Sequence, residues 1–428
     1  MSANLTLLTP SEYNRTLMMK KDKCDKYDYL VSAVCGVIGG LMDIFLVGTP
    51  AKSHLGNWTD TQTNNAVISF AKTLGWKPKA EITSDRAIDF LQKKFVVNYD
   101  QQGSRWAEGV ENMTMSNHHM MSLGHSPDIV GLFFSILNQF TSTSSFISNG
   151  RIVTVNTRTF ELQGSNFITK ILCGVVNWFG HLMSDVAGSS GAVTRGSGIV
   201  IPFFELFGLF NFVKFGRYKE DLATIAVKVF ESGYDFRFGL AMGIPVVVTE
   251  CLIRLFWSMR RHFQYGYPIR DCIPSMNHDT LRVMLIIGNG TLCVIDGFDA
   301  LIRSGGNMVE FFLHLNLIAW FRFIFLVLKE VFLTLQIGLF LQKNIECYRR
   351  MNQALLEYMQ QLEKIDISAF RAETEIYNQL ISDFEKAETP QQLNQMLLSA
   401  YERLGLTKPW EGDFKQHMRN KNTRLVFE

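Results

Sequence analysis

The stretch YLVSAVCGVIGGLMDIFLVG, residues 29–48, decides the class of fold. It is almost entirely apolar, and about 20 such residues are what a helix needs to cross a bilayer. Four lysines stand between residues 20 and 26, directly before it. A cleavable signal would have a shorter basic region and a small-residue cleavage site, so we expect an uncleaved first span with a cytoplasmic N-terminus.

Further apolar runs predict an all-α fold, a polytopic helical membrane protein with about five to seven membrane segments. These runs lie at residues 129–147, 167–187, 199–215, 238–257, 281–303 and 308–342. Three regions have the composition of water-soluble protein, namely a polar N-terminal segment (1–28), an insertion at about 49–124 and a tail (343–428). We therefore expect a helical membrane domain at 29–342 that contains the soluble insertion.

Charge and cysteine content argue against a nucleic-acid-binding protein and against a small protein stabilised by zinc or disulfides. The 42 basic and 40 acidic residues give a net charge of +2, which lacks the basic excess expected of a nucleic-acid-binding protein. The seven cysteines are scattered without a CxxC pair, so a zinc ribbon or a disulfide framework is not expected.

The tail from residue 343 onward predicts a soluble helical region. Apolar residues recur there at helical spacing, and Thr389 and Pro390 mark a turn between two helices. Lys343, Arg349 and Arg350 place its start on the cytoplasmic side. We expect the tail to contact a cytoplasmic protein partner.

A polar pair interrupts the apolar run NWFGHLMSDVAGSSG, residues 177–191. His181 and Asp185 are four positions apart, which puts an imidazole and a carboxylate on one face of a helix. Such a pair can bind a divalent metal ion, or it can be a buried structural pair. Both interpretations stay open at this point.

A second polar box, NHHMMSLGHSPD at residues 117–128, holds three of the nine histidines. His125 and Asp128 are candidate partners for His181 and Asp185. Gly124 predicts a turn, with a helix beginning just after it. His118 and His119 are either further ligands or the wet end of a loop.

Charged residues inside the apolar runs need partners. Asp43 lies near the end of the first span, where a carboxylate costs about 2.5–3.5 kcal/mol on insertion scales. Farther along, Asp299 and Arg303 are four apart and are expected to form an ion pair within one helix. Asp296 either supports that polar helix or is an additional ligand.

The order of these motifs resembles the membrane-bound metal-dependent hydrolase family of bacteria over roughly residues 40–190. That family has an early acidic box, then a box ending in Thr-His-Ser, then His-Leu-Leu-x-Asp before a small-residue turn. Here GGLMD ends at Asp43, GHS contains His125, and HLMSD contains His181 and Asp185. The resemblance implies that these four residues bind the metal, with catalytic roles for Asp185 and Asp43.

The expected function is therefore metal-dependent hydrolysis in the cell membrane, the inner membrane in a bacterium. Imidazole and carboxylate ligands suit a divalent metal such as zinc, which lowers the pKa of a bound water. The substrate would be a lipid or another membrane-accessible ester. The alternative is a non-enzymatic membrane effector, channel or scaffold with a partner-sensing cytoplasmic tail. In either case we expect a multi-pass protein with both termini in the cytoplasm.

Overall fold

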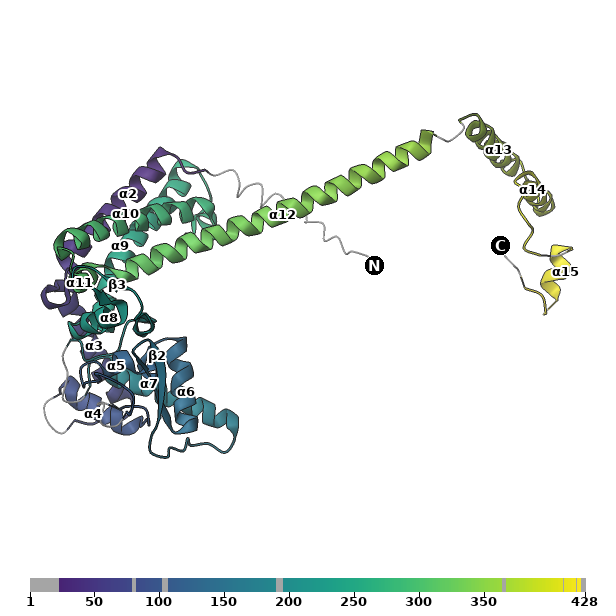
Figure 1. The fold of residues 1–428 in the computed structure, drawn as a ribbon. Helices are drawn as coiled ribbons and strands as arrows, with labels where there is room; N and C mark the ends of the chain where they lie inside the picture. Colours follow the sequence, from purple (N-terminus) through teal and green to yellow (C-terminus); the bar gives the residue numbers. More distant parts are fainter. Residues whose placement is uncertain are drawn as a thin grey trace. The chain divides into compact units, whose positions relative to one another are not determined.

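The computed structural model describes residues 23–78, 82–101, 107–189, 195–363, 367–410, 412–420 and 422–424. The chain is mostly helical, as predicted, with two small two-stranded sheets among the described residues (Figure 1). It forms two compact units, Met1–Phe332 and Leu333–Glu428.

The elements of the first unit follow one another in this order: α2 (Lys26–Met42), η1 (Asp43–Val47), η2 (Pro50–Lys52), α3 (His54–Thr73), α4 (Ser84–Lys94), α5 (His118–Met121), η4 (Leu123–His125), α6 (Ile129–Thr141), β1 (Thr143–Ser148), β2 (Arg151–Asn156), α7 (Phe167–Asp185), η5 (Phe204–Leu209), β3 (Lys214–Phe215), β4 (Glu220–Asp221), α8 (Leu222–Glu231), α9 (Phe236–Met259), η6 (Arg260–Gln264), η7 (Ile269–Cys272), α10 (Asp279–Ser304) and α11 (Met308–His314). Helix α12 (Leu317–Glu363) begins in this unit and continues into the second, which also contains α13 (Ile367–Glu385), α14 (Pro390–Arg403) and α15 (Phe414–Arg419).

Four of the described helices are long and apolar enough to cross a membrane by length and composition: Lys26–Val47, Phe236–Gln264, Asp279–Ser304 and Leu317–Gln361. Each overlaps an apolar run named above. In Figure 1, α2, α9 and α10 pack against one another. The total of five to seven segments stays a prediction.

Glycine allows α2 to approach its neighbours closely. A Cβ atom at Gly36 would lie 2.3 Å from the carbonyl oxygen of Gly288 in α10. One at Gly39 would lie 2.1 Å from the hydroxyl oxygen of Thr249 in α9. No side chain fits at either position without moving a neighbour.

Two apolar runs in the middle of the chain do not form helices over their full length. Residues 199–215 do not form a continuous helix, because Pro202 lacks a backbone N–H and Phe203 adopts a left-handed φ of 64°. Residues 129–147 form a helix only as far as Thr141, and the hydroxyl-rich remainder is strand β1. This strand pairs antiparallel with β2 through a turn at Asn149 and Gly150.

The predicted soluble insertion packs against later parts of the chain. Val67 of α3 and Ile88 and Leu91 of α4 share one core with Leu182 and Val186 at the end of α7. This core holds the end of α7 in place, and that end carries the polar pair identified in the sequence.

Candidate metal centre

Helix α7 presents His181 and Asp185 on one face, as their spacing predicts. Asn166 caps its first turn in a reciprocal capping box with Thr169, and the helix ends at Asp185. The Nε2 atom of His181 lies 3.1 Å from Oδ2 of Asp185, and both side chains are buried. The predicted pair is therefore present.

The second box brings His125 to the same place. Residues 123–125 form a 3₁₀ turn, so the predicted break in the helix is confirmed. The Nε2 atom of His125 lies 3.3 Å from Nε2 of His181. Helix α6 begins later than expected, at Ile129, because Asp128 is its N-cap. Asp128 is therefore a helix cap and not a partner of His181, contrary to the prediction.

His118 and His119 also belong to this cluster, and the interpretation as a wet loop end was wrong. Both are buried, with 1% and 2% of their surfaces exposed. The Nε2 atom of His118 lies 3.5 Å from Oδ1 of Asp100. The Nε2 atom of His119 lies 3.6 Å from Oδ2 of Asp185.

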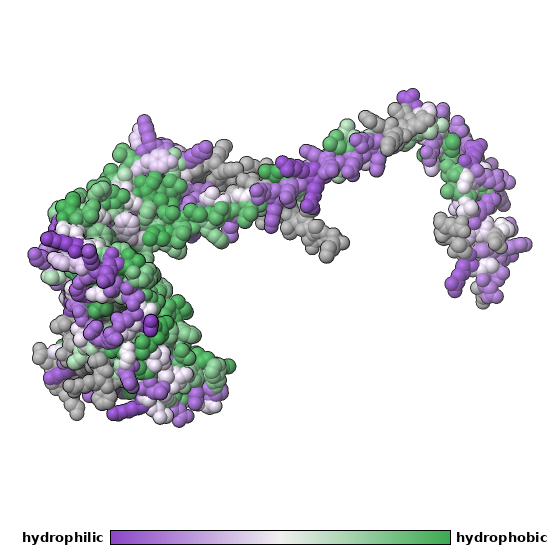
Figure 2. Space-filling model, viewed as in Figure 1, coloured by the Kyte–Doolittle hydropathy of each residue, from purple (hydrophilic) through white to green (hydrophobic). Residues whose placement is uncertain are grey.

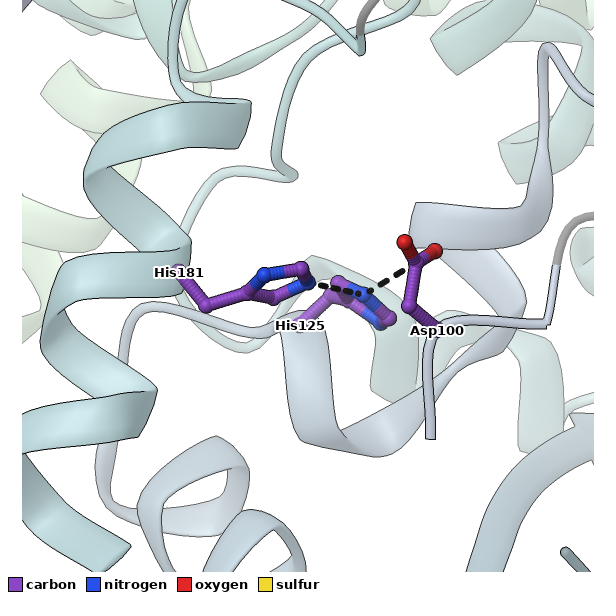
Figure 3. Close-up of side chains that lie close together, drawn as sticks. All are labelled: Asp100, His125 and His181. Carbon is purple, nitrogen blue, oxygen red and sulfur yellow. Dashed lines mark hydrogen bonds and ion pairs between the residues drawn. The ribbon is translucent and has the colours of Figure 1, made fainter. Parts of the chain in front are cut away.

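Asp100 is a member of the site that sequence reasoning missed. Figure 3 shows it beside His125, with His181 on the other side of that imidazole. Its Oδ1 atom lies 3.9 Å from Nε2 of His125. No periodicity or motif marks Asp100, because its loop position depends on contacts with residues far away in the sequence.

Hydrogen bonds at the Nδ1 atoms orient three of the imidazoles. Nδ1 of His118 contacts the carbonyl oxygen of Met115 at 2.9 Å. Nδ1 of His119 lies 3.1 Å from the carbonyl oxygen of Ser197, and Nδ1 of His125 lies 2.8 Å from Oγ of Ser122. A carbonyl partner requires the proton on Nδ1, which leaves the Nε2 lone pair facing the cluster. This is how metal-ligating histidines are usually held.

Burial sets the protonation of the cluster. It lowers the pKa of His119 and of His125 well below the ordinary value, so both imidazoles are neutral. Burial also raises the pKa of Asp185 to about 6, against the opposing effect of His181. For Asp100, burial acts upward, but the nearby imidazoles of His118, His181 and His125 prevail and lower its pKa.

Tyr99 closes one side of the cluster. Its ring is fully buried and meets the rings of His125 and His181 edge to face, at centroid distances of 5.2 and 5.9 Å. Its hydroxyl accepts a hydrogen bond from Ser135. The tyrosine thus excludes water from that side of the imidazoles.

The donor atoms fit a metal ion in number and chemistry. They form three overlapping groups in which all ligand atoms lie within 4.8 Å of one another: Asp100, His125 and His181; Asp100, His118 and His119; His119, His125 and Asp185. Nε2 of His118, Oδ1 of Asp100 and Oδ2 of Asp185 are buried without a hydrogen-bond partner among the described residues. Buried polar atoms are rarely left without a partner, and a metal ion is a partner that all three atoms could bind.

Asp43, predicted as a fourth ligand, lies in a different cluster. Its Oδ1 atom accepts a hydrogen bond of 2.5 Å from the amide of Asn316. The backbone N–H of Asn316 and the indole of Trp320 in turn donate to Asp296. None of the ligand groups found among the described residues includes Asp43 or Asp296. The structure therefore does not bring Asp43 to the histidines.

The other predicted ion pair is present. Nε of Arg303 lies 2.7 Å from Oδ1 of Asp299 within α10. This supports the structural interpretation of those two residues.

Comparison of the chain with protein-family models, with curated proteins and with solved structures finds no match.

Proposed function

We propose that the chain is an integral membrane protein that binds divalent metal ions and hydrolyses a lipid or another membrane-accessible ester. The observation that carries this proposal is the convergence of four buried imidazoles, the buried carboxylate of Asp185 and the partly exposed carboxylate of Asp100 from separate parts of the chain into one cluster. Unpaired imidazole and carboxylate groups are costly to bury, so such a cluster needs a ligand to bind.

Six donors are more than one tetrahedral ion requires. A catalytic zinc ion takes three protein ligands and keeps one open position, and paired ions lie about 3.5–4 Å apart with shared ligands. Two of the three groups, Asp100 with His125 and His181 and Asp100 with His118 and His119, have only Asp100 in common, and a carboxylate can bridge two ions. We therefore propose that the cluster binds two ions, with zinc the best fit to these ligands.

The residues of the cluster would have different roles in hydrolysis. A metal ion bound here would lower the pKa of a water and polarise the ester oxygen. The anchored imidazoles fix the ligand geometry, and Tyr99 keeps bulk water off one side. Asp185 faces three of the four imidazoles and is the carboxylate we assign to receive the proton of the attacking water.

Measuring the metal content tests the proposal. Purified wild-type chain should contain zinc or a similar ion by mass spectrometry, and His181→Ala should contain less of it, because the variant lacks a ligand of one of the three groups. His54→Ala is the matched control, since His54 is exposed at the start of α3. Hydrolysis of phospholipid in nanodiscs should stop on chelation and return with metal. Equal metal content in His181→Ala and wild type would contradict the proposal.

A second candidate function is a channel or other non-enzymatic effector. It is favoured by the polar cluster of Asp43, Asp296 and Asn316 within helices that could cross a membrane. A cavity of about 440 Å³ adjoins it, lined also by Arg303 and Glu310. This function predicts ion flux in liposomes that a chelator does not change, whereas the hydrolase predicts chelator-sensitive lipid cleavage.

The second unit is proposed to bind a cytoplasmic partner. Helices α13 and α14 contact each other, with Leu380 and Ala400 buried between exposed surfaces. Leu393 and Leu397 of α14 remain exposed at helical spacing. A partner helix could cover this stripe.

A further inference from the structure

Helix α6 has the reverse of the polarity expected in water. Ile129, Phe133, Leu137 and Phe140 are exposed by 68, 59, 39 and 36%, at spacings of four, four and three residues. On its other face, Ser135, Asn138 and Gln139 are completely buried. The helix contains no charged residue. It therefore turns its polar side chains inward and an apolar stripe outward.

Helix α7 has the same arrangement. Ile168, Leu172, Val176 and Phe179 are exposed by 69, 59, 56 and 51%. The polar residues of its last two turns, His181, Ser184 and Asp185, face inward, whereas Thr169, Lys170 and Asn177 are partly exposed.

The two stripes belong to neighbouring helices. The amide of Gln139 donates to the carbonyl oxygen of Gly174, and Asn177 donates to the Gln139 side chain, both at 3.1 Å. At one end the rings of Phe140 and Phe167 are in contact, with centroids 5.6 Å apart. We call the eight exposed residues of the two stripes the α6–α7 apolar face.

A lipid leaflet is the occupant that the structure favours for this face. The same unit contains α2, α9 and α10, which also expose apolar residues and are long enough to cross a membrane. Figure 2 shows hydrophobic surface over α2 and α10 and again where α6 lies. Phe203 is also exposed, and its backbone N–H donates to Asp128 at the start of α6.

The length of α6 favours an interfacial position over a full crossing. Its 13 residues extend about 20 Å, whereas the hydrocarbon core is about 30 Å thick. A short helix with one apolar face lies in the plane of the interface, with that face in the acyl region.

We propose that the α6–α7 apolar face inserts into one leaflet and that the metal cluster draws its substrate, a phospholipid, from that leaflet. The second half rests on the proposed function. The face adjoins the cluster in sequence and in space, because His125 lies four residues before α6 and Phe179 lies two residues before His181. A cavity of about 960 Å³ opens beside Asp100 and is lined by Val96, Met115 and Arg158. The two apolar residues suit an acyl chain, and the guanidinium suits a phosphate.

Photolabelling tests the insertion on the wild-type chain. The protein is reconstituted in nanodiscs whose phosphatidylcholine has a diazirine in its acyl chain, and adducts are mapped by mass spectrometry. Adducts are expected on residues 129–140 and 167–179 as well as on α2 and α10. Helix α4 of the same unit is the control and should stay unlabelled. The proposal would be overturned if α2 and α10 were labelled and α6 and α7 were not. It would also be overturned if the chain were dimeric in the disc and α6 and α7 stayed unlabelled.

A variant tests the link to the substrate. Ile168→Gln with Leu172→Gln should reduce cleavage of bilayer phospholipid at least tenfold while metal content and cleavage of a short-chain, monomeric phospholipid in solution stay unchanged. Equal loss on both substrates would refute the lipid-delivery role. If wild type cleaves neither substrate and binds no metal, the proposed hydrolase fails, whereas the adduct pattern still decides whether the face is inserted.

Discussion

The Nε2 atoms of His125 and His181 lie 3.3 Å apart, although 56 positions separate the two residues in the sequence. Metal bonds near 2 Å place the donor atoms of one ion about 3–4 Å from each other. Burial lowers the pKa of His125, and the neutral imidazole is the form that binds a metal. The pair thus has the separation of two ligands of one ion, and His125 has the protonation that a ligand needs.

The number of bound ions should fall when His118 is removed. His118 belongs only to the group with Asp100 and His119, so His118→Ala leaves the other two groups, which both need the one Nε2 lone pair of His125 and therefore hold one ion between them. We expect about two ions per chain in wild type and about one in His118→Ala, since each ion needs about three protein ligands. Metal-to-protein ratios from mass spectrometry check this. The same ratio in both proteins would show that His118 holds no separate ion.

Loss of the Ser122 hydroxyl should weaken metal binding, because this hydroxyl orients the imidazole of His125. Ser122→Ala removes the partner of the His125 Nδ1 atom, so the imidazole is less well oriented and we expect metal affinity to fall about 10–100-fold. Competition with a zinc chelator measures the dissociation constant. Ser145→Ala is a matched control, because that buried hydroxyl bonds to Asn138 and not to the cluster. Equal metal affinities for Ser122→Ala and wild type would show that Ser122 does not orient His125 for metal binding.

Local spacing made part of the site predictable. The four-residue interval of His181 and Asp185 and the histidine box around His125 can be read directly from the sequence. Asp100 could not be found that way. The side chain of Asn98 holds its loop by donating to Asn138, Thr143 and Thr157, residues 40, 45 and 59 positions away.

The fold was predictable where an apolar run is long and forms a regular helix. Residues 29–48 and 281–303 became helices for that reason. Hydropathy alone could not predict residues 199–215, where the backbone of Phe203 turns to bond Asp128. The resemblance to the hydrolase family did not place Asp43 correctly either, because the order of motifs along the chain does not specify their distances in space.

Glu205 should make stability depend on pH. Burial, with the neighbouring charge of Asp128, raises the pKa of Glu205 from 4.5 to about 8. Between these values the folded chain keeps a proton that the unfolded chain releases, so the free energy of unfolding falls as pH rises from about 4.5 to 8. The loss should be on the order of 3 kcal/mol, given about 1.4 kcal/mol per pKa unit and partial relaxation.

Glu205→Gln tests this dependence, because a neutral amide keeps the acceptor for Ser126 without the titration. Melting temperatures in detergent from pH 5 to pH 9 should decline less in Glu205→Gln than in wild type. Parallel pH profiles for the two proteins would mean that Glu205 is not protonated at neutral pH.

The close approach of α2 to α10 should be sensitive to a single methyl group. In Gly36→Ala the new Cβ would lie 2.3 Å from the backbone oxygen of Gly288 and 2.7 Å from Cβ of Thr291, so the two helices must separate. Overpacking of this kind costs about 1–3 kcal/mol. Gly243→Ala in α9 is the control, since no atom lies within 4 Å of the Cβ position there and alanine favours the helix. Thermal unfolding in detergent should show a lower melting temperature for Gly36→Ala and an equal or higher one for Gly243→Ala, with metal content unchanged in both. If the two variants have the same melting temperature, the close contact between α2 and α10 does not require glycine at position 36.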